Sequence, residues 1–118
     1  MIENNTKKRI LEEVVEAAKK KTTIPYGILA SRVGLISQPN WFHIIGSYLF
    51  RINKDMMEKD KKVPLLSAIV VKEGEEEVPG DGFWECAYQL GRWDGNTNKF
   101  DFLKMEKEAV WNYDWDKI

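Results

Sequence analysis

The chain has 118 residues, of which 43% are hydrophobic and 31% are charged, and its formal net charge is −1. This length and composition are typical of one globular domain with a single core, so we expect one domain over residues 1–118 and exclude a disordered chain. No apolar run approaches the roughly 20 residues that a bilayer requires, and the N-terminal sequence lacks the apolar core of a signal peptide. We therefore expect a cytoplasmic protein.

The N-terminal third of the sequence predicts two helices. Thr6 is a suitable N-cap for a first helix that runs to about Lys21, and the lysines at its end suit the negative end of the helix dipole. Residues 22–34 predict a short helix with Pro25 in its first turn and Gly34 as its stop. The residues expected on the buried faces are Ile10, Leu11, Val14, Val15, Ala18, Leu29, Ala30 and Val33.

A third helix is expected to begin near Asn40 and to fade within residues 54–62, because apolar residues recur along it at helical spacing. Gly46 lies inside this helix, where a glycine costs up to about 1 kcal/mol relative to alanine. We therefore expect Gly46 to allow close packing against another helix or against the backbone of a ligand. The residues expected on the buried face are Trp41, Ile44, Ile45, Tyr48, Leu49 and Ile52.

The pattern then changes from helical to strand-like. Residues 65–71 are apolar except for Ser67 and partly β-branched. A second short strand near Glu77 and Val78 would complete a hairpin around an acidic turn. Two further helices are predicted, one over 83–90 and one over about 99–115. Their expected core contacts are Phe83, Trp84, Ala87, Leu90, Phe102, Met105, Ala109, Val110 and Tyr113.

The fold class that this order predicts is α+β and mainly α. Three helices followed by a β-hairpin are typical of a winged helix-turn-helix core, to which the two C-terminal helices are added. The sequence contains no internal repeat and no low-complexity linker, which agrees with a single domain.

Charge is distributed unevenly along the chain. Residues 1–62 contain 12 Lys and Arg against 7 Asp and Glu, a net charge of +5, whereas residues 63–118 contain 6 against 12, a net charge of −6. This asymmetry indicates a nucleic acid or a charged protein as partner, although a solvated surface without a partner explains it equally well. The acidic cluster within residues 73–81 would repel phosphates, so we expect a solvated hairpin tip there rather than a DNA contact or a calcium site.

Residues that bind metals through nitrogen or sulfur are scarce. Cys86 and His43 are the only cysteine and the only histidine, so the chain has no Cys-x-x-Cys pattern and no disulfide framework. A zinc site would need several carboxylates in addition. We therefore expect no metal and no other cofactor.

Three stretches of the sequence carry a family resemblance: Ile24–Gly34, Pro64–Val71 and Pro79–Phe83. They resemble a family of small uncharacterised bacterial and phage proteins over most of the chain. At a greater distance, the same order of elements, led by a Tyr-Gly-x-Leu-Ala helix, is similar to the winged-helix domain of the alkylguanine-DNA alkyltransferases and alkyltransferase-like proteins. That similarity implies a helix-turn-helix that docks in the minor groove of DNA.

The second resemblance also implies what has become of the alkyltransferase chemistry. The family motif Pro-Cys-His-Arg-Val-Val would fall on Leu66–Val71, which places Ser67 at the reactive cysteine and Ala68 at its histidine partner. The family pattern Arg-Ala-Val-Gly would fall on residues 43–46, which places His43 at the arginine that props open the base stack. The resemblance therefore implies a non-enzymatic protein, and a neutral histidine is a poorer phosphate contact than an arginine.

Ser67 is still a candidate nucleophile in its own right. A reactive serine needs a base, and the only histidine, His43, lies on a different, helical element. An enzyme would require these two side chains to lie within about 3 Å of each other. We interpret Ser67 as a buried hydroxyl bonded to a neighbouring backbone group, and Cys86 as a small core residue.

Two hypotheses about function follow. The first is a DNA-binding module that contacts nucleic acid through the helix beginning near Asn40; the expected contacts are Arg32, His43, Ser47, Arg51 and Lys54. The second is a protein-interaction module or phage-encoded inhibitor that presents the acidic hairpin and exposed tryptophans to a basic partner surface. Its expected interface residues are Trp93, Trp111 and Trp115, unless the last helix uses these rings to pack on the core.

Overall fold

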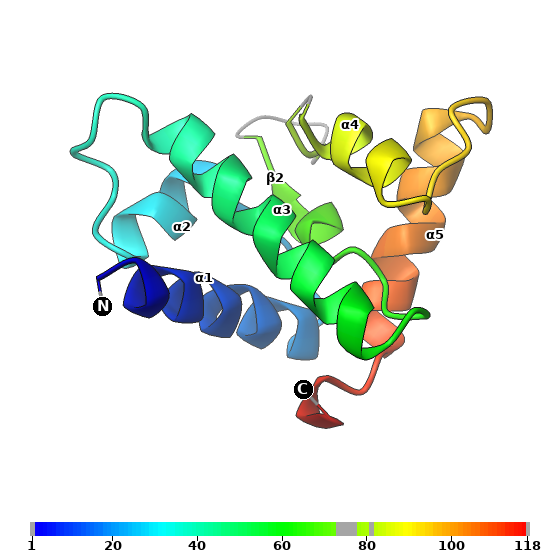
Figure 1. Ribbon diagram of the computed structural model, residues 1–118, viewed down its shortest axis with the longest axis horizontal. Helices are drawn as coiled ribbons and strands as arrows, with labels where there is room; N and C mark the ends of the chain where they lie inside the picture. Colours follow the sequence, from blue (N-terminus) through cyan, green and yellow to red (C-terminus); the bar gives the residue numbers. More distant parts are fainter. Residues whose placement is uncertain (1, 73–77, 81, 118) are drawn as a thin grey trace.

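The computed structural model describes residues 2–72, 78–80 and 82–117. Within these residues the chain is α+β and mainly α, as predicted, with helices packed around a short buried segment (Figure 1). The helices are α1 (Ile2–Lys19), α2 (Tyr26–Arg32), α3 (Trp41–Lys59), α4 (Gly82–Gln89) and α5 (Lys99–Asn112). Two 3₁₀ turns, η1 (Leu66–Ile69) and η2 (Trp115–Lys117), and two short strands, β1 (Ile24–Pro25) and β2 (Val70–Val71), complete the order.

The first three helices lie close to their predicted positions. No proline or glycine precedes Thr6, so α1 begins at Ile2 instead of at the predicted cap. Pro25, predicted in the first turn of α2, is instead its extended N-cap and the end of β1. The chain leaves α2 through Gly34, whose φ of +79° suits glycine. Buried Met56 anchors the last turns of α3, which ends at Lys59, within the predicted range of 54–62. The buried residues of the three helices include Ile10, Val14, Ala18, Leu29, Ala30, Ile45, Leu49 and Ile52.

The centre of the molecule is the segment 63–71, in which every residue is buried. The 3₁₀ turn η1 within this segment contacts α1, α3 and α5, and Figure 1 shows it with β2 behind α3. The prediction of a strand over 65–71 is therefore wrong for most of its length, since only Val70 and Val71 are extended in a strand. Helices on several sides of the segment leave room for a single strand partner. The 3₁₀ turn instead forms hydrogen bonds between its own backbone groups, such as the bond of 3.0 Å from Ala68 N to Leu65 O.

The strand pairing also differs from the prediction. β2 pairs in parallel with β1, with Ile24 opposite Val70 and Pro25 opposite Val71. Val78 is outside any strand, although its carbonyl accepts a hydrogen bond of 2.7 Å from the Lys72 N–H. The rest of the predicted hairpin, residues 73–77, lies outside the described residues.

The two C-terminal helices differ from the prediction mainly in register. α5 ends at Asn112, and Met105, expected in the core, is 67% exposed, whereas Glu106 is buried. The helix begins at Lys99 because the side chain of Asn98 caps it, accepting hydrogen bonds from the next backbone N–H groups. Within the described residues, no helix combines the length and apolar character needed to cross a bilayer.

Glu106 joins α5 to the centre of the fold. Its Oε2 accepts a hydrogen bond of 2.7 Å from the Leu65 N–H and one of 3.1 Å from Arg92 Nε, and its Oε1 accepts one of 2.8 Å from Arg92 Nη2. The Glu106 side chain is 5% exposed and the Arg92 side chain is 25% exposed. This two-pronged ion pair therefore holds the loop after α4, the helix α5 and the central segment together.

Candidate functional site

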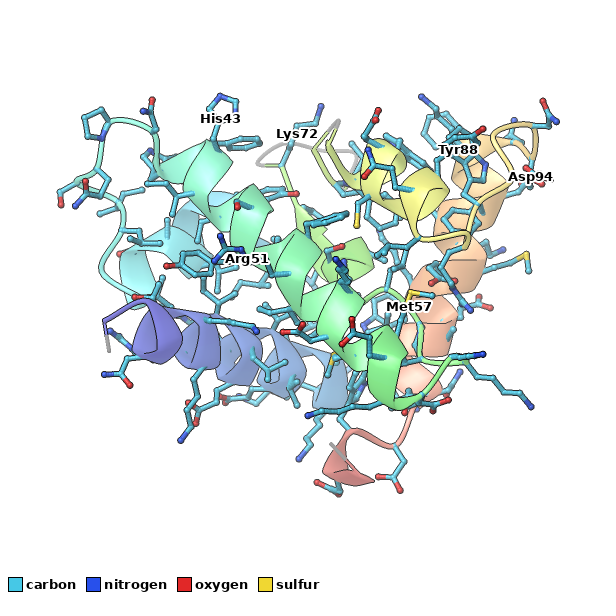
Figure 2. The ribbon with its side chains drawn as sticks, viewed as in Figure 1. His43, Arg51, Met57, Lys72, Tyr88 and Asp94 are labelled. Carbon is cyan, nitrogen blue, oxygen red and sulfur yellow. The ribbon has the colours of Figure 1, made fainter. Side chains whose placement is uncertain are left out.

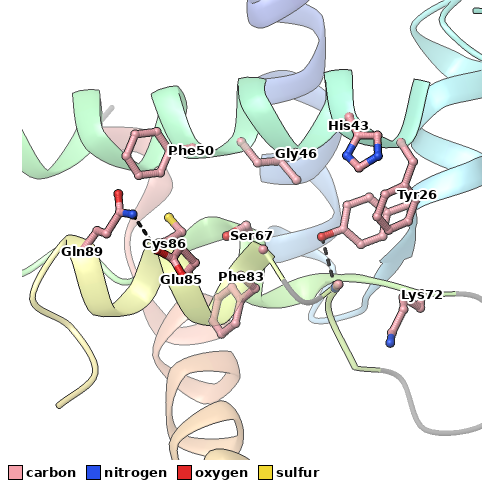
Figure 3. A pocket seen from close by; sticks show the side chains of 14 residues that line it. Tyr26, His43, Gly46, Phe50, Ser67, Lys72, Phe83, Glu85, Cys86 and Gln89 are labelled. Carbon is pink, nitrogen blue, oxygen red and sulfur yellow. Dashed lines mark hydrogen bonds between the residues drawn. The ribbon is translucent and has the colours of Figure 1, made fainter. Parts of the chain in front are cut away.

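A cavity of about 610 Å³ lies between α3, α4 and the end of β2 (Figure 3). Its walls are largely apolar and aromatic, formed by Tyr26, Phe42, Leu49, Phe50 and Phe83. Its polar lining consists of His43, Ser67, Lys72, Glu85, Cys86 and Gln89, and three glycines complete it. A cavity of this size, with aromatic walls and a few polar groups, is typical of a site for a small ligand.

Asn53 supplies the polar group beneath this cavity. Its side chain is buried on the inner face of α3, and its Nδ2 donates a hydrogen bond of 2.8 Å to Ser67 Oγ and lies 3.7 Å from Cys86 Sγ. Its Oδ1 is buried without a hydrogen-bond partner among the described residues. A buried amide oxygen without a partner costs about 1–3 kcal/mol, so the polar cluster retains one unmet acceptor beside the lining residues Ser67 and Cys86.

Ser67 is thus engaged as a hydrogen-bond acceptor. The predicted backbone partner is wrong, because the amide of Asn53 bonds to the hydroxyl. His43 is exposed at the rim of the cavity, whereas Ser67 lies inside it, and Figure 3 shows the two on separate elements. Burial raises the pKa of the Cys86 thiol, an effect that the hydrogen bond from Asn53 partly opposes. The Cys86 thiol is therefore held in its protonated form at neutral pH.

Tyr26 and Phe42 form one end of the cavity. Their ring centroids lie 4.6 Å apart, and the Tyr26 hydroxyl accepts a hydrogen bond of 3.3 Å from the Gly80 N–H. A Cβ at Gly80 would lie 3.1 Å from the Phe42 ring, so glycine is what allows the backbone to approach these rings. Burial raises the pKa of Tyr26, and its hydrogen bond from Gly80 acts in the opposite direction. Sequence reasoning assigned Tyr26 no role in a site.

Gly46 lies on the α3 side of the cavity. A Cβ at this position would have no atom within 4 Å, so the prediction that Gly46 packs closely against another helix is wrong. Instead, the missing side chain leaves space in the cavity, and Gly46 lies between the lining residues Phe42 and Phe50 along α3. Phe42 and Phe50, one turn before and one turn after Gly46, therefore line the space that the glycine leaves open.

Four of the five predicted nucleic-acid contacts share one exposed face of α3. His43, Ser47, Arg51 and Lys54 are all exposed, and their spacing places them within an arc of about 80° on the helix. We call these four residues the α3 stripe. Figure 2 shows His43 and Arg51 projecting from α3, and the Arg51 guanidinium lies 5.9 Å from the Tyr48 ring centroid. Because His43 also lines the cavity, the stripe and the cavity meet at this residue.

Arg32 lies apart from the other four predicted contacts. It belongs to α2, where its Nη1 donates a hydrogen bond of 3.0 Å to Glu13 Oε1 on α1. Its carbonyl also accepts a hydrogen bond of 2.5 Å from Arg9. These bonds tie Arg32 to α1, so it is separate from the α3 stripe.

The three tryptophans of the predicted protein interface are bonded within the chain. Trp115 is 5% exposed, so its predicted exposure is wrong, and its Nε1 donates to Val110 O at 2.7 Å. Trp111 and Trp93 are half-buried, and their Nε1 groups donate to Thr22 O at 3.0 Å and to Thr97 O at 2.9 Å. The C-terminal rings therefore pack the end of the chain onto the core, which is the alternative that the sequence left open.

The whole acidic cluster predicted as a hairpin tip, Glu73, Glu75, Glu76, Glu77 and Asp81, lies outside the described residues. Among the residues that the structure describes, no group of three His, Cys, Asp or Glu side chains is placed to hold a metal ion.

Sequence reasoning missed Asn53, although a signal was present. Asn53 lies four residues after Leu49 and three before Met56, on the same buried face of α3. A polar residue at a position that helical spacing assigns to the core needs a buried partner.

Comparison of the chain with family models, with curated proteins and with solved structures finds no match.

Proposed function

We propose that this chain is a non-enzymatic DNA-binding domain with a winged-helix-like core. In this proposal α3 lies against the DNA backbone and the cavity between α3 and α4 receives one unstacked base. The observation that carries it is that an exposed basic stripe and an aromatic cavity share a single helix and meet at His43.

The composition of the α3 stripe supports the contact with DNA. Arg51 and Lys54 are exposed cations, and Ser47, one turn before Arg51, is a small hydrogen-bond donor. Phosphate contacts of this kind position a protein on DNA and dominate its affinity. Lys72, exposed at the cavity lining, places a further positive charge beside the path of a strand that enters the cavity.

The cavity walls support the reception of a base. A base that leaves the stack is commonly held between aromatic or apolar side chains and read by hydrogen bonds to its edge. Phe42, Phe50 and Phe83 offer such surfaces, while Ser67 and Gln89 offer polar groups. The absence of an activated nucleophile among the described lining residues supports binding without chemistry, since the Ser67 hydroxyl is bonded to Asn53 and burial keeps Cys86 protonated.

The winged-helix assignment is also part of the proposal. Its support is the hydrogen bond from Lys72 N to Val78 O, which brings these two residues together just after β2, where a wing would begin and end. The protein-interaction alternative is less favoured, because Trp115 is buried and the indoles of Trp93 and Trp111 are bonded within the chain.

The contact with DNA is tested by a mobility-shift titration of a duplex at several salt concentrations. Arg51→Ala and Lys54→Ala should each weaken binding for all sequences and reduce the slope of log K against log salt by about one. Lys104→Ala removes an exposed lysine from α5 and serves as the control, which should leave the slope unchanged. Failure of the protein to retain any duplex or single strand at low salt would reject the proposal.

The entry of a base is tested separately with DNA that contains 2-aminopurine, whose fluorescence rises when the base unstacks. Gly46→Leu should fill the cavity from α3 while leaving the α3 stripe intact, so it should keep DNA affinity and lose the fluorescence rise. Gly46→Ala is the matched control and should keep both. An equal fluorescence rise with the Gly46→Leu variant would show that the base goes elsewhere.

A further inference from the structure

A second cavity, of about 360 Å³, lies between α4, the loop that follows it and the first residue of α5. It is lined by Trp84, Glu85, Tyr88, Trp93 and Lys99. The indole rings of Trp84 and Trp93 meet edge to face with their centroids 5.6 Å apart. The cavity is thus walled by three aromatic rings, with one carboxylate and one ammonium group among its lining.

Lys99 already places a cation in this cavity. Its Nζ lies over both indoles, 5.3 Å from the ring centroid of Trp84 and 5.8 Å from that of Trp93. Both distances fall within the range of cation–π attraction. Among the described residues, no carboxylate or carbonyl accepts a hydrogen bond from this ammonium, so the rings are its described partners. The cavity therefore holds a cation by aromatic faces and not by an ion pair.

The loop that carries Trp93 is fixed before any ligand arrives. The Asp94 carboxylate accepts hydrogen bonds of 2.8 Å from Asn96 N and 2.7 Å from Thr97 N, and these bonds lower the pKa of Asp94. A Cβ at Gly95, whose φ is +83°, would lie 3.2 Å from the Tyr88 ring, so the loop rests against that ring. Figure 2 shows Tyr88 and Asp94 on the same side of the molecule.

We propose that this aromatic cavity is a binding site for a trimethylammonium group, and that Lys99 is its resident intramolecular occupant. A primary ammonium is strongly hydrated and has three N–H donors that the rings satisfy poorly. A trimethylammonium has no such donors and fills more of the space between the rings, which is the chemistry that aromatic cages recognise. Glu85, exposed at the edge of the cavity, contributes the opposite charge. This site goes beyond the proposed DNA binding and does not depend on it.

The test is a titration with choline, followed through the indole N–H signals of Trp84 and Trp93 in NMR spectra. The control ligand is 3,3-dimethylbutanol, which has the same shape as choline and no charge. Choline should shift both signals and the neutral ligand should bind more weakly. Lys99→Ala removes the competing cation and should tighten choline binding about 2- to 5-fold, the equivalent of one exposed cation–π contact. Lys104→Ala, which changes the same charge elsewhere on α5, should have no such effect.

A loss-of-binding variant completes the test. Tyr88 is 60% exposed, so Tyr88→Ala removes one wall without opening the core and should weaken choline binding by a similar factor. Peptides with trimethyl-lysine and with unmodified lysine distinguish a protein-borne trimethylammonium from a free one. If the natural ligand is a methylated protein, the trimethyl-lysine peptide should bind more tightly than choline does. Equal binding of 3,3-dimethylbutanol and choline, or no binding of choline by the Lys99→Ala variant, would overturn the proposal.

Discussion

Glu106 is the residue whose loss we expect to destabilise this fold most. Its carboxylate is buried and accepts hydrogen bonds from Arg92 and from the backbone N–H of Leu65, so three parts of the chain meet at one side chain. Glu106→Ala would remove all of these bonds at once. It would leave the mostly buried guanidinium of Arg92 and the buried N–H of Leu65 without their acceptors.

The size of the effect follows from these two groups. Removing one partner of a buried ion pair typically costs about 3–5 kcal/mol. The Arg92 side chain is 25% exposed and keeps some access to water, which lowers this cost, whereas the unsatisfied Leu65 N–H adds about 1–3 kcal/mol. We therefore expect Glu106→Ala to lower the free energy of unfolding by about 4 kcal/mol. Glu106→Gln keeps an acceptor for one of the bonds and should lose roughly half as much.

The measurement is urea unfolding followed by tryptophan fluorescence, in a double-mutant cycle with Arg92→Ala. The cycle isolates the coupling between the two side chains, which should reach at least about 2 kcal/mol. The pair of Arg32 and Glu13 is a control for exposed ion pairs, since these side chains are 58% and 30% exposed. Its coupling should stay below about 1 kcal/mol.

The reasoning would be refuted by a Glu106→Ala variant that loses less than about 1 kcal/mol with an unchanged slope against urea. It would also fail if the two cycles gave equal coupling energies. Either result would show that the buried Arg92–Glu106 pair contributes no more to stability than an exposed ion pair does.

Three further predictions concern the first cavity. Gly46→Ala should raise the free energy of unfolding by up to about 1 kcal/mol, because alanine favours the helix and its Cβ meets no atom; a loss in a urea melt would contradict this. Tyr26 has a raised pKa in the folded protein, so the stability that depends on its proton is present below about pH 10 and is lost as pH rises through the folded pKa; Tyr26→Phe should flatten this alkaline loss in pH-dependent melts. Cys86 should react with a thiol reagent far more slowly in the native protein than in urea, and equal rates would show that the thiol is accessible.

The helices could be predicted from the sequence because their signals are local. Helical spacing and end signals such as Asn40, Pro25 and Gly34 mark where α2 and α3 begin or end, and the structure agrees within one or two residues. The segment 65–71 could not be predicted in this way. Its apolar, β-branched residues suit a buried strand, but helices contact it on several sides and leave most of it without a strand partner.

The polar residues of the interior were missed for a different reason. Glu106 lies four residues after Phe102 and four before Val110, so the helical stripe of α5 runs through a charged side chain. The sequence-based choice of Met105 in place of Glu106 shifted the stripe by one residue because it followed hydrophobicity alone. A buried carboxylate requires a cation that arrives from elsewhere in the chain, and no local pattern indicates that Arg92 will supply it.

The geometry of α3 relates the candidate site to the core. Each residue turns the helix by about 100°, so a shift of one residue moves a side chain to a neighbouring face. Ile45, Leu49, Ile52 and Met56 face the core, Phe42, Gly46 and Phe50 face the cavity, and the α3 stripe faces solvent beside the cavity. Because the core residues fix the rotation of the helix, they also fix the position of the basic stripe along the rim of the cavity. In the proposed complex, a DNA strand that follows the α3 stripe toward His43 would therefore pass the open side of the cavity. The alignment of stripe and cavity depends on core packing more than on any residue of the site itself.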